Sequence, residues 1–86
     1  MTDVSDKNAI QESVLNFLAD ETGLDPDEVT VETGLFTSGE LDSLDILKIV
    51  SFIEKTYGMS ISPFEVSLQK LNSISLISDF VIKKAS

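Results

Sequence analysis

Apolar residues recur at helical spacing along the first quarter of the chain. Four of them fall at positions i, i+4, i+7 and i+8, which is one face of a helix: Ile10, Val14, Phe17 and Leu18. Gly23 follows, where a residue of left-handed conformation commonly ends a helix, and Leu24 is placed for the apolar contact that accompanies such an end. The pattern predicts a first helix from about Ser5 to Thr22.

A second run of helical spacing predicts a helix that starts at Asp42 or Ser43 and ends at Tyr57, before Gly58. Asp42 is a good N-cap residue, and a carboxylate three positions later can reach back toward the cap. Asp45 occupies that position, where its charge also meets the helix dipole. The core face is expected to consist of Ile46, Ile49, Val50, Ile53 and Tyr57.

The same segment carries apolar residues away from this core face. Leu44 and Leu47 lie together on its first two turns, and we expect them to be exposed. Phe52 also lies off the face, where exposure and burial by a neighbouring element are equally compatible with the pattern.

A short third helix is predicted from the start signal of residues 62–65. Ser62 supplies an N-cap, Pro63 suits the first helical position and Glu65 completes a capping box. We expect this helix to end near Ser67 or Leu68.

The last helix is expected to begin after Asn72 or Ser73 and to bury Ile74, Ile77 and Val81. It finishes in Lys83 and Lys84, whose positive charges suit a helix C-terminus. Together, the segments predict an all-α fold: a small four-helix bundle with three longer helices and a short third one.

Residues 24–41 are expected to form a long loop, because Pro26, Gly34 and Gly39 interrupt any continuous pattern. Asp25 precedes the proline and could cap a single helical turn. Loops of this length are usually functional or disordered. Four apolar residues are expected to anchor this one: Val29, Val31, Leu35 and Phe36.

The composition fits one small acidic domain over residues 1–86. Fifteen acidic residues against six basic ones give a formal charge of -9, which argues against nucleic acid and anionic membranes as partners. Basic partner proteins are favoured, although a folded body with a solvated acidic surface explains the charge equally well. No leader or membrane span is recognisable, and no cysteine is present, so we expect a monomeric cytoplasmic protein.

Residue chemistry argues against an enzyme. The chain lacks His and Cys, so no serine can be activated by a conventional base and no thiolate or imidazole metal site can form. Asp42 and Asp45 flank an expected exposed helix start, which offers no burial to separate their pKa values. No calcium-loop motif is present, and the acids at Asp25, Asp27 and Glu28 are best explained as a solvated loop.

Gly39, Glu40, Leu41, Asp42, Ser43 and Leu44 form the segment that bears on function. Here the chain resembles the acyl carrier and peptidyl carrier family, which attaches 4'-phosphopantetheine to the Ser of an Asp-Ser-Leu motif at the start of its second helix. The resemblance extends over nearly the whole chain, through the order of its helices and long loop. It implies that Ser43 carries the phosphopantetheine arm and that Asp42 helps the attaching transferase hold magnesium and coenzyme A.

A serine in the first turn of a helix also has a physical rationale as a phosphate carrier. Unpaired backbone N–H groups and the positive end of the helix dipole favour an anion there. Without its context, Ser43 would be an ordinary helix-start serine. The surrounding pattern favours the modified serine.

The resemblance implies a carrier that holds acyl or aminoacyl groups as thioesters and moves them between enzymes. The expected partners are a phosphopantetheinyl transferase, a loading enzyme and downstream synthases or transferases. Docking is expected on the second helix, at a set of six residues: Leu44, Asp45, Leu47, Lys48, Ser51 and Glu54.

This helix departs from the strongly acidic form that fatty-acid carriers usually show. Lys48 and Lys55 lie on its expected exposed side, and Ser51 stands where a larger apolar residue is common. We therefore expect a discrete carrier of a specialised pathway, such as polyketide or nonribosomal peptide synthesis. D-alanyl and fatty-acid-type carriers remain alternatives.

Two hypotheses of other classes remain. The chain could be an acidic helical adaptor without a prosthetic group, which does not require Ser43, or a calcium sensor, which predicts a large calcium-dependent change in melting temperature. No linker to a synthase domain is recognisable, so we expect a freestanding protein.

Overall fold

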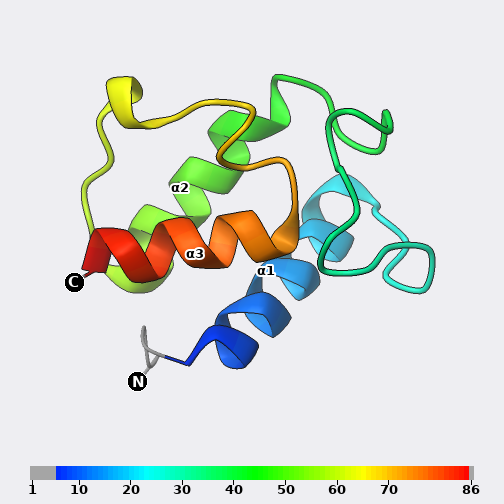
Figure 1. The fold of residues 1–86 in the computed structure, drawn as a ribbon, viewed down its shortest axis with the longest axis horizontal. Coiled ribbons are helices and arrows are strands. Elements are labelled where there is room, and N and C mark those ends of the chain that lie inside the picture. The colour runs from blue at the N-terminus through cyan, green and yellow to red at the C-terminus, as the bar shows by residue number, and fades with distance from the viewer. Residues whose placement is uncertain (1–5, 86) are drawn as a thin grey trace.

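The computed structural model describes residues 6–85. Three α-helices and one 3₁₀ helix, with no strand, make up this part of the chain: α1 (Lys7–Thr22), α2 (Asp45–Tyr57), η1 (Pro63–Glu65) and α3 (Ile74–Ala85). Figure 1 shows α3 lying across α1 and α2, with the long loop gathered at one side of the molecule. The all-helical prediction is confirmed. No helix within residues 6–85 is long and apolar enough to span a bilayer.

The first helix has the predicted core face. Ile10, Val14 and Leu18 are fully buried, and α1 packs against α3. The side chain of Asp6 caps the helix by accepting a hydrogen bond from the backbone N–H of Ala9. The predicted start at Ser5 lies outside the described residues. Gly23 has the expected left-handed conformation, with a φ of 76°.

The second helix also buries its predicted face. Ile49 and Ile53 are fully buried, while Ile46, Val50 and Tyr57 are half-buried and pack against the core. Phe52 is covered as well: its ring stacks on that of Phe17 of α1, with centroids 4.3 Å apart. Contact with α1 thus buries part of Phe52, whose exposure the sequence pattern did not determine.

The predicted third helix is shorter than expected. The full capping box is present, because Ser62 accepts from the N–H of Phe64 and Glu65 accepts from the N–H of Ser62. However, the segment closes only one 3₁₀ turn and ends at Glu65, not at Ser67 or Leu68. The four-helix bundle is therefore not confirmed, since η1 contributes no buried residue.

The last helix begins at Ile74, as predicted, and the hydroxyl of Ser73 accepts from the N–H of Leu76 at 3.0 Å. Ile77 and Val81 are fully buried. Near its end, Lys84 forms an ion pair with Glu65. This ion pair ties the C-terminal end of α3 to η1.

Tyr57 is the last residue of α2, and its hydroxyl group is buried. Within residues 6–85 this hydroxyl has no hydrogen-bond partner. Burial raises the pKa of Tyr57 above its ordinary value of 10.0, and the nearby Ser13 hydroxyl, which falls short of hydrogen-bonding geometry, offsets the rise only in part. An unsatisfied buried hydroxyl destabilises the folded state.

We predict that Tyr57→Phe is as stable as the native protein at pH 7, or more stable by about 1 kcal/mol, because it removes this unsatisfied group. The unfolded phenol ionises near pH 10.0 and the folded one only at higher pH. The native protein therefore loses stability as the pH rises through this window. Tyr57→Phe has no phenol to ionise and is expected to lack this pH-dependent loss of stability. Melting temperatures of both proteins, measured at pH 7 and above pH 10, test this. A destabilised variant at pH 7 would indicate a hydrogen bond and contradict the prediction.

Candidate functional site

Ser43 lies in an exposed turn immediately before α2. Its side chain is exposed, and its hydroxyl has no hydrogen-bond partner among residues 6–85. The sequence predicted a serine at the start of this helix and open to solvent, and the structure has it there.

Asp42 and Asp45 hold this turn by two hydrogen bonds from backbone N–H groups to their carboxylates. Asp42 Oδ1 accepts from the N–H of Leu44 at 2.9 Å, and Asp45 Oδ2 accepts from the N–H of Asp42 at 3.0 Å. The expected carboxylate bonds are therefore present, but they hold the turn before α2: the N-cap residue of α2 itself is Leu44, which makes no side-chain cap bond. The α-helix itself begins at Asp45, later than predicted, because the three residues before it form 3₁₀-type bonds, with N–H groups of residues 45–47 bonded to carbonyls three positions back.

These bonds correct one expectation about the helix start. We expected unpaired N–H groups there to favour an anion. In the structure the N–H groups of residues 44–47 are all engaged, either by the Asp42 carboxylate or by backbone carbonyls. The favourable contribution to a phosphate on Ser43 therefore comes from the helix dipole, and not from the N–H groups of residues 44–47.

Asp45 is also less available than expected. Its side chain is only 16% exposed, and besides capping Asp42 it lies 3.6 Å from the ammonium group of Lys48. The sequence predicted a negative charge on the exposed side of α2. Capping geometry turns the carboxylate toward the chain instead, and Lys48 offsets its charge.

The loop before Ser43 is held by Asn72, which sequence analysis treated only as a boundary residue. Its side-chain oxygen accepts from the N–H groups of Phe36 and Thr37 at 2.9 and 3.3 Å, and its amide nitrogen donates to the Thr37 hydroxyl. Its backbone oxygen accepts from the N–H of Leu35. One residue at the start of α3 thus fixes the middle of the long loop.

Burial of two leucines completes this anchoring. Leu35 is fully buried and Leu41 is 4% exposed, and the N–H of Leu41 donates to the carbonyl of Leu35 at 2.9 Å. Leu41 lies two residues before Ser43, so its burial holds the start of α2 against the core. Val31, a predicted anchor, is 38% exposed; the backbone carbonyl of Val31 makes the contact, by accepting from Ser75 N–H.

Gly34 permits the close approach of this loop segment. A Cβ at position 34 would collide with the Thr37 hydroxyl and lie 3.3 Å from the Asn72 amide nitrogen. Glycine is needed here because a side chain would have no room, whereas the sequence indicated only that Gly34 interrupts the helical pattern.

The predicted turn near the start of the loop is also present. Asp25 Oδ1 accepts from the N–H of Asp27 at 2.9 Å, and the Asp25 carbonyl accepts from the N–H of Glu28. Within residues 6–85, no three acidic residues come together as a set that could hold a metal ion.

Three of the six predicted docking residues are exposed, and the other three are partly buried. Leu44 and Leu47 are each 70% exposed, and Lys48 is exposed beside them. Ser51 is half-buried. Glu54 faces the protein: its Oε2 accepts from the N–H of Ile61 at 2.8 Å and so fixes the chain after α2. Its role in docking stays a prediction, with the carboxylate already engaged.

Comparison of the sequence with known proteins places the chain in a family. Residues 12–81 match the family described as "Phosphopantetheine attachment site". A protein of Rubrobacter xylanophilus named "Acyl carrier protein" is 30% identical over 91% of this chain and 94% of its own length. One of the same name from Thermosynechococcus vestitus is 28% identical over 93% and 96% of the two chains. No solved structure matches the chain significantly.

The chain therefore belongs to the acyl carrier proteins, the family of carriers that bear phosphopantetheine. Its cofactor is 4'-phosphopantetheine. The relatives include "Acyl carrier protein 2, mitochondrial" of Arabidopsis thaliana, which is 32% identical over 88% of this chain and 59% of its own length. Members of this family carry groups for enzymes, so interaction with enzymes follows from membership.

We predict that Asn72→Ala lowers the free energy of unfolding by about 1–3 kcal/mol, because it leaves two backbone N–H groups of the loop without their partner. Chemical denaturation measures this loss. Asn16→Ala, on an exposed position of α1, is the matched control and is expected to lose no stability. An Asn72→Ala variant as stable as this control would show that the loop does not depend on the side chain.

Proposed function

We propose that Ser43 carries the 4'-phosphopantetheine arm of this carrier, with acyl or aminoacyl groups held as thioesters on the arm's thiol. The observation that supports this most directly is the exposed Ser43 hydroxyl, without a hydrogen bond within residues 6–85, in the turn that Asp42 and Asp45 hold before α2. The residues fit the group, since the hydroxyl is open for attachment and the helix dipole favours the phosphodiester. When bound, the arm supplies the thiol that forms the thioester.

Asp42 is proposed to assist attachment. Its Oδ1 caps the turn through Leu44, while its Oδ2 has no hydrogen-bond partner within residues 6–85. An exposed carboxylate oxygen next to the acceptor hydroxyl suits a magnesium ion supplied by the transferase. The same side chain can therefore hold Ser43 in position and contact the metal.

We propose that the chain is a carrier and not a catalyst. No His or Cys is present, and no basic group within the described residues forms a hydrogen bond with the Ser43 hydroxyl that could activate it. Chemistry on the cargo then belongs to the partner enzymes. The carrier contributes a high effective concentration of the tethered group at each active site, as a single domain over residues 1–86, monomeric and cytoplasmic.

The docking surface is proposed to centre on Leu44 and Leu47, next to Ser43. Two leucines that are each 70% exposed at the site of attachment suit contact with several partners, because apolar contact is non-directional. Lys48 and Ser51 extend this surface along α2, and Asp45 and Glu54 contribute at its edges. The phosphopantetheinyl transferase, a loading enzyme and downstream synthases or transferases are the expected partners.

A specialised pathway is our preferred assignment. Lys48 and Lys55 place positive charge on the exposed side of α2, which weakens attraction to strongly basic docking surfaces. The printed name of the relatives fits fatty acid synthesis equally well, and a D-alanyl carrier is a further alternative. The intact mass of the protein isolated from its native host identifies the cargo directly.

We predict that incubation with coenzyme A, magnesium and a broad-specificity phosphopantetheinyl transferase adds one arm to the native chain and none to Ser43→Ala. Intact-mass spectrometry measures the addition. Ser38→Ala, which removes another exposed serine of the same loop, is the control and is expected to load. An unmodified native chain, under conditions that load a known carrier, would favour the acidic adaptor without a prosthetic group.

We predict that Leu47→Ala raises the KM of this transferase severalfold while leaving the melting temperature nearly unchanged, because an exposed leucine contributes little to the core. Leu76→Ala on α3, where the leucine is 40% exposed, is the matched control and is expected to leave KM unchanged. Steady-state kinetics with the carrier as the varied substrate measure both. Equal KM values for the two variants would remove Leu47 from the docking surface.

A further inference from the structure

A pocket on the side of α3 contrasts with the acidic character of the rest of the chain. Three lysines line it, Lys70, Lys83 and Lys84, together with the carboxylates Glu65 and Asp79 and the apolar side chains Leu76 and Phe80. We call it the α3 pocket. It shares no residue with the Ser43 site, and its volume of about 460 Å³ is typical of small-molecule sites.

Charge in the α3 pocket is opposite in sign to that of the whole protein. Half of the six basic residues of a chain with a formal charge of -9 gather here. The two carboxylates are already engaged: Glu65 bonds Lys84 and the N–H of Ser62, and Asp79 lies 2.9 Å from Lys7. A cation would therefore meet a lining of net positive charge.

The pKa of Glu65 supports this description. The hydrogen bond from Lys84 lowers it most, followed by the bond from the Ser62 N–H. Glu65 is thus held as a carboxylate and fixes Lys84 at the edge of the pocket.

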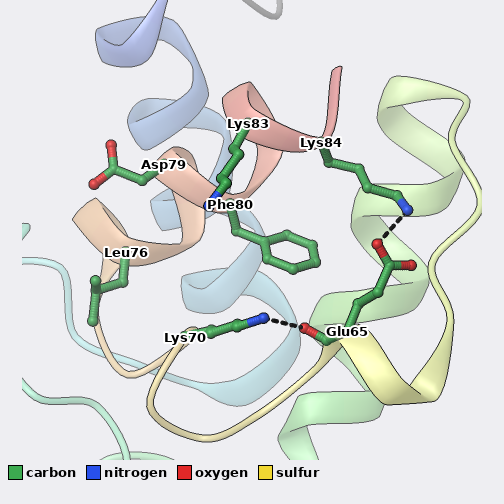
Figure 2. A pocket seen from close by; sticks show the side chains of 7 residues that line it. All are labelled: Glu65, Lys70, Leu76, Asp79, Phe80, Lys83 and Lys84. Carbon is green, nitrogen blue, oxygen red and sulfur yellow. Dashed lines mark hydrogen bonds and ion pairs between the residues drawn. The ribbon is translucent and has the colours of Figure 1, made fainter. Parts of the chain in front are cut away.

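Donors and an apolar wall face the same space. Lys70 Nζ donates to the Glu65 backbone carbonyl at 3.3 Å, which leaves two of its three N–H groups for another acceptor. Figure 2 shows the Phe80 ring directed into the space framed by Lys70, Glu65 and Lys84. Leu76, 40% exposed, extends the apolar wall along α3.

We propose that the α3 pocket binds an amphipathic organic anion, whose carboxylate or phosphate head contacts Lys70 and Lys83 and whose apolar body packs on Phe80 and Leu76. Lysine ammonium groups bind both kinds of head as point charges. Binding is independent of the arm on Ser43, because no residue is common to the two sites.

Titration of the native chain with octanoate, followed by the chemical shifts of assigned backbone amides, tests the proposal. Octanoate is expected to shift residues that line the α3 pocket, with saturation, while octylammonium and 1-octanol leave them unshifted. Octyl phosphate in a parallel titration distinguishes the two head groups by relative affinity. The same result is expected for unmodified Ser43→Ala, so failure of the Ser43 assignment leaves this test intact.

Lys70→Gln combined with Lys83→Gln is expected to weaken octanoate binding by about tenfold, from the loss of charge-assisted contacts. Lys84 stays unchanged in this variant, because it ties α3 to η1. Lys55→Gln, an exposed lysine of α2, is the matched control and is expected to bind as the native chain does. Unchanged melting temperatures show that the variants are folded.

Three outcomes would overturn the proposal. They are equal affinity for octanol and octanoate, equal affinity of the double variant and the Lys55→Gln control, and shifts confined to core residues such as Ile49 and Ile53. The last would mean that the alkyl chain enters between the helices.

Discussion

The site depends on one polar contact, between the side chain of Asn72 and the backbone of residues 36 and 37. Asn72 lies just before α3, whereas the loop that it holds precedes α2, so its hydrogen bonds join two segments 35 and 36 positions apart in the chain. Buried backbone groups require partners, and the N–H groups of residues 36 and 37 find theirs outside the loop, in the Asn72 side chain. With the loop fixed, Leu35 and Leu41 become buried, and Ser43 projects from a start of α2 that is held against the core.

The helix start itself combines rigidity with exposure. Asp42 accepts from the N–H of Leu44 and Asp45 accepts from the N–H of Asp42, which places Ser43 between two fixed residues while its own hydroxyl makes no hydrogen bond in the described part of the chain. A carrier needs this combination, because the attaching enzyme must recognise a defined backbone and still reach the hydroxyl. The exposed Leu44 and Leu47 lie on the same turns, so attachment and docking share one rigid scaffold.

Positive charge is unevenly distributed over the surface of this acidic protein. Lys48 of α2 lies beside the attachment turn, and a group of three lysines lines the pocket around Phe80 on α3. Local carboxylates partly offset the positive charge at both places, Asp45 that of Lys48 and Glu65 that of Lys84. A formal charge of -9 therefore describes the average surface, whereas binding depends on local regions that differ in sign.

The sequence by itself determined the core faces of the three α-helices, the carboxylate bonds of Asp42 and Asp45, and the cap at Ser62, because periodicity and capping are local properties read over a few positions. Ser43 was identified through the resemblance of its segment to carrier proteins. Only the tertiary structure decided the coverage of Phe52 by Phe17, the inward direction of Glu54, the single 3₁₀ turn at η1 and the role of Asn72. Each of these depends on a partner far away in the chain or on how far a turn can continue against the core, and local pattern carries no information about such contacts.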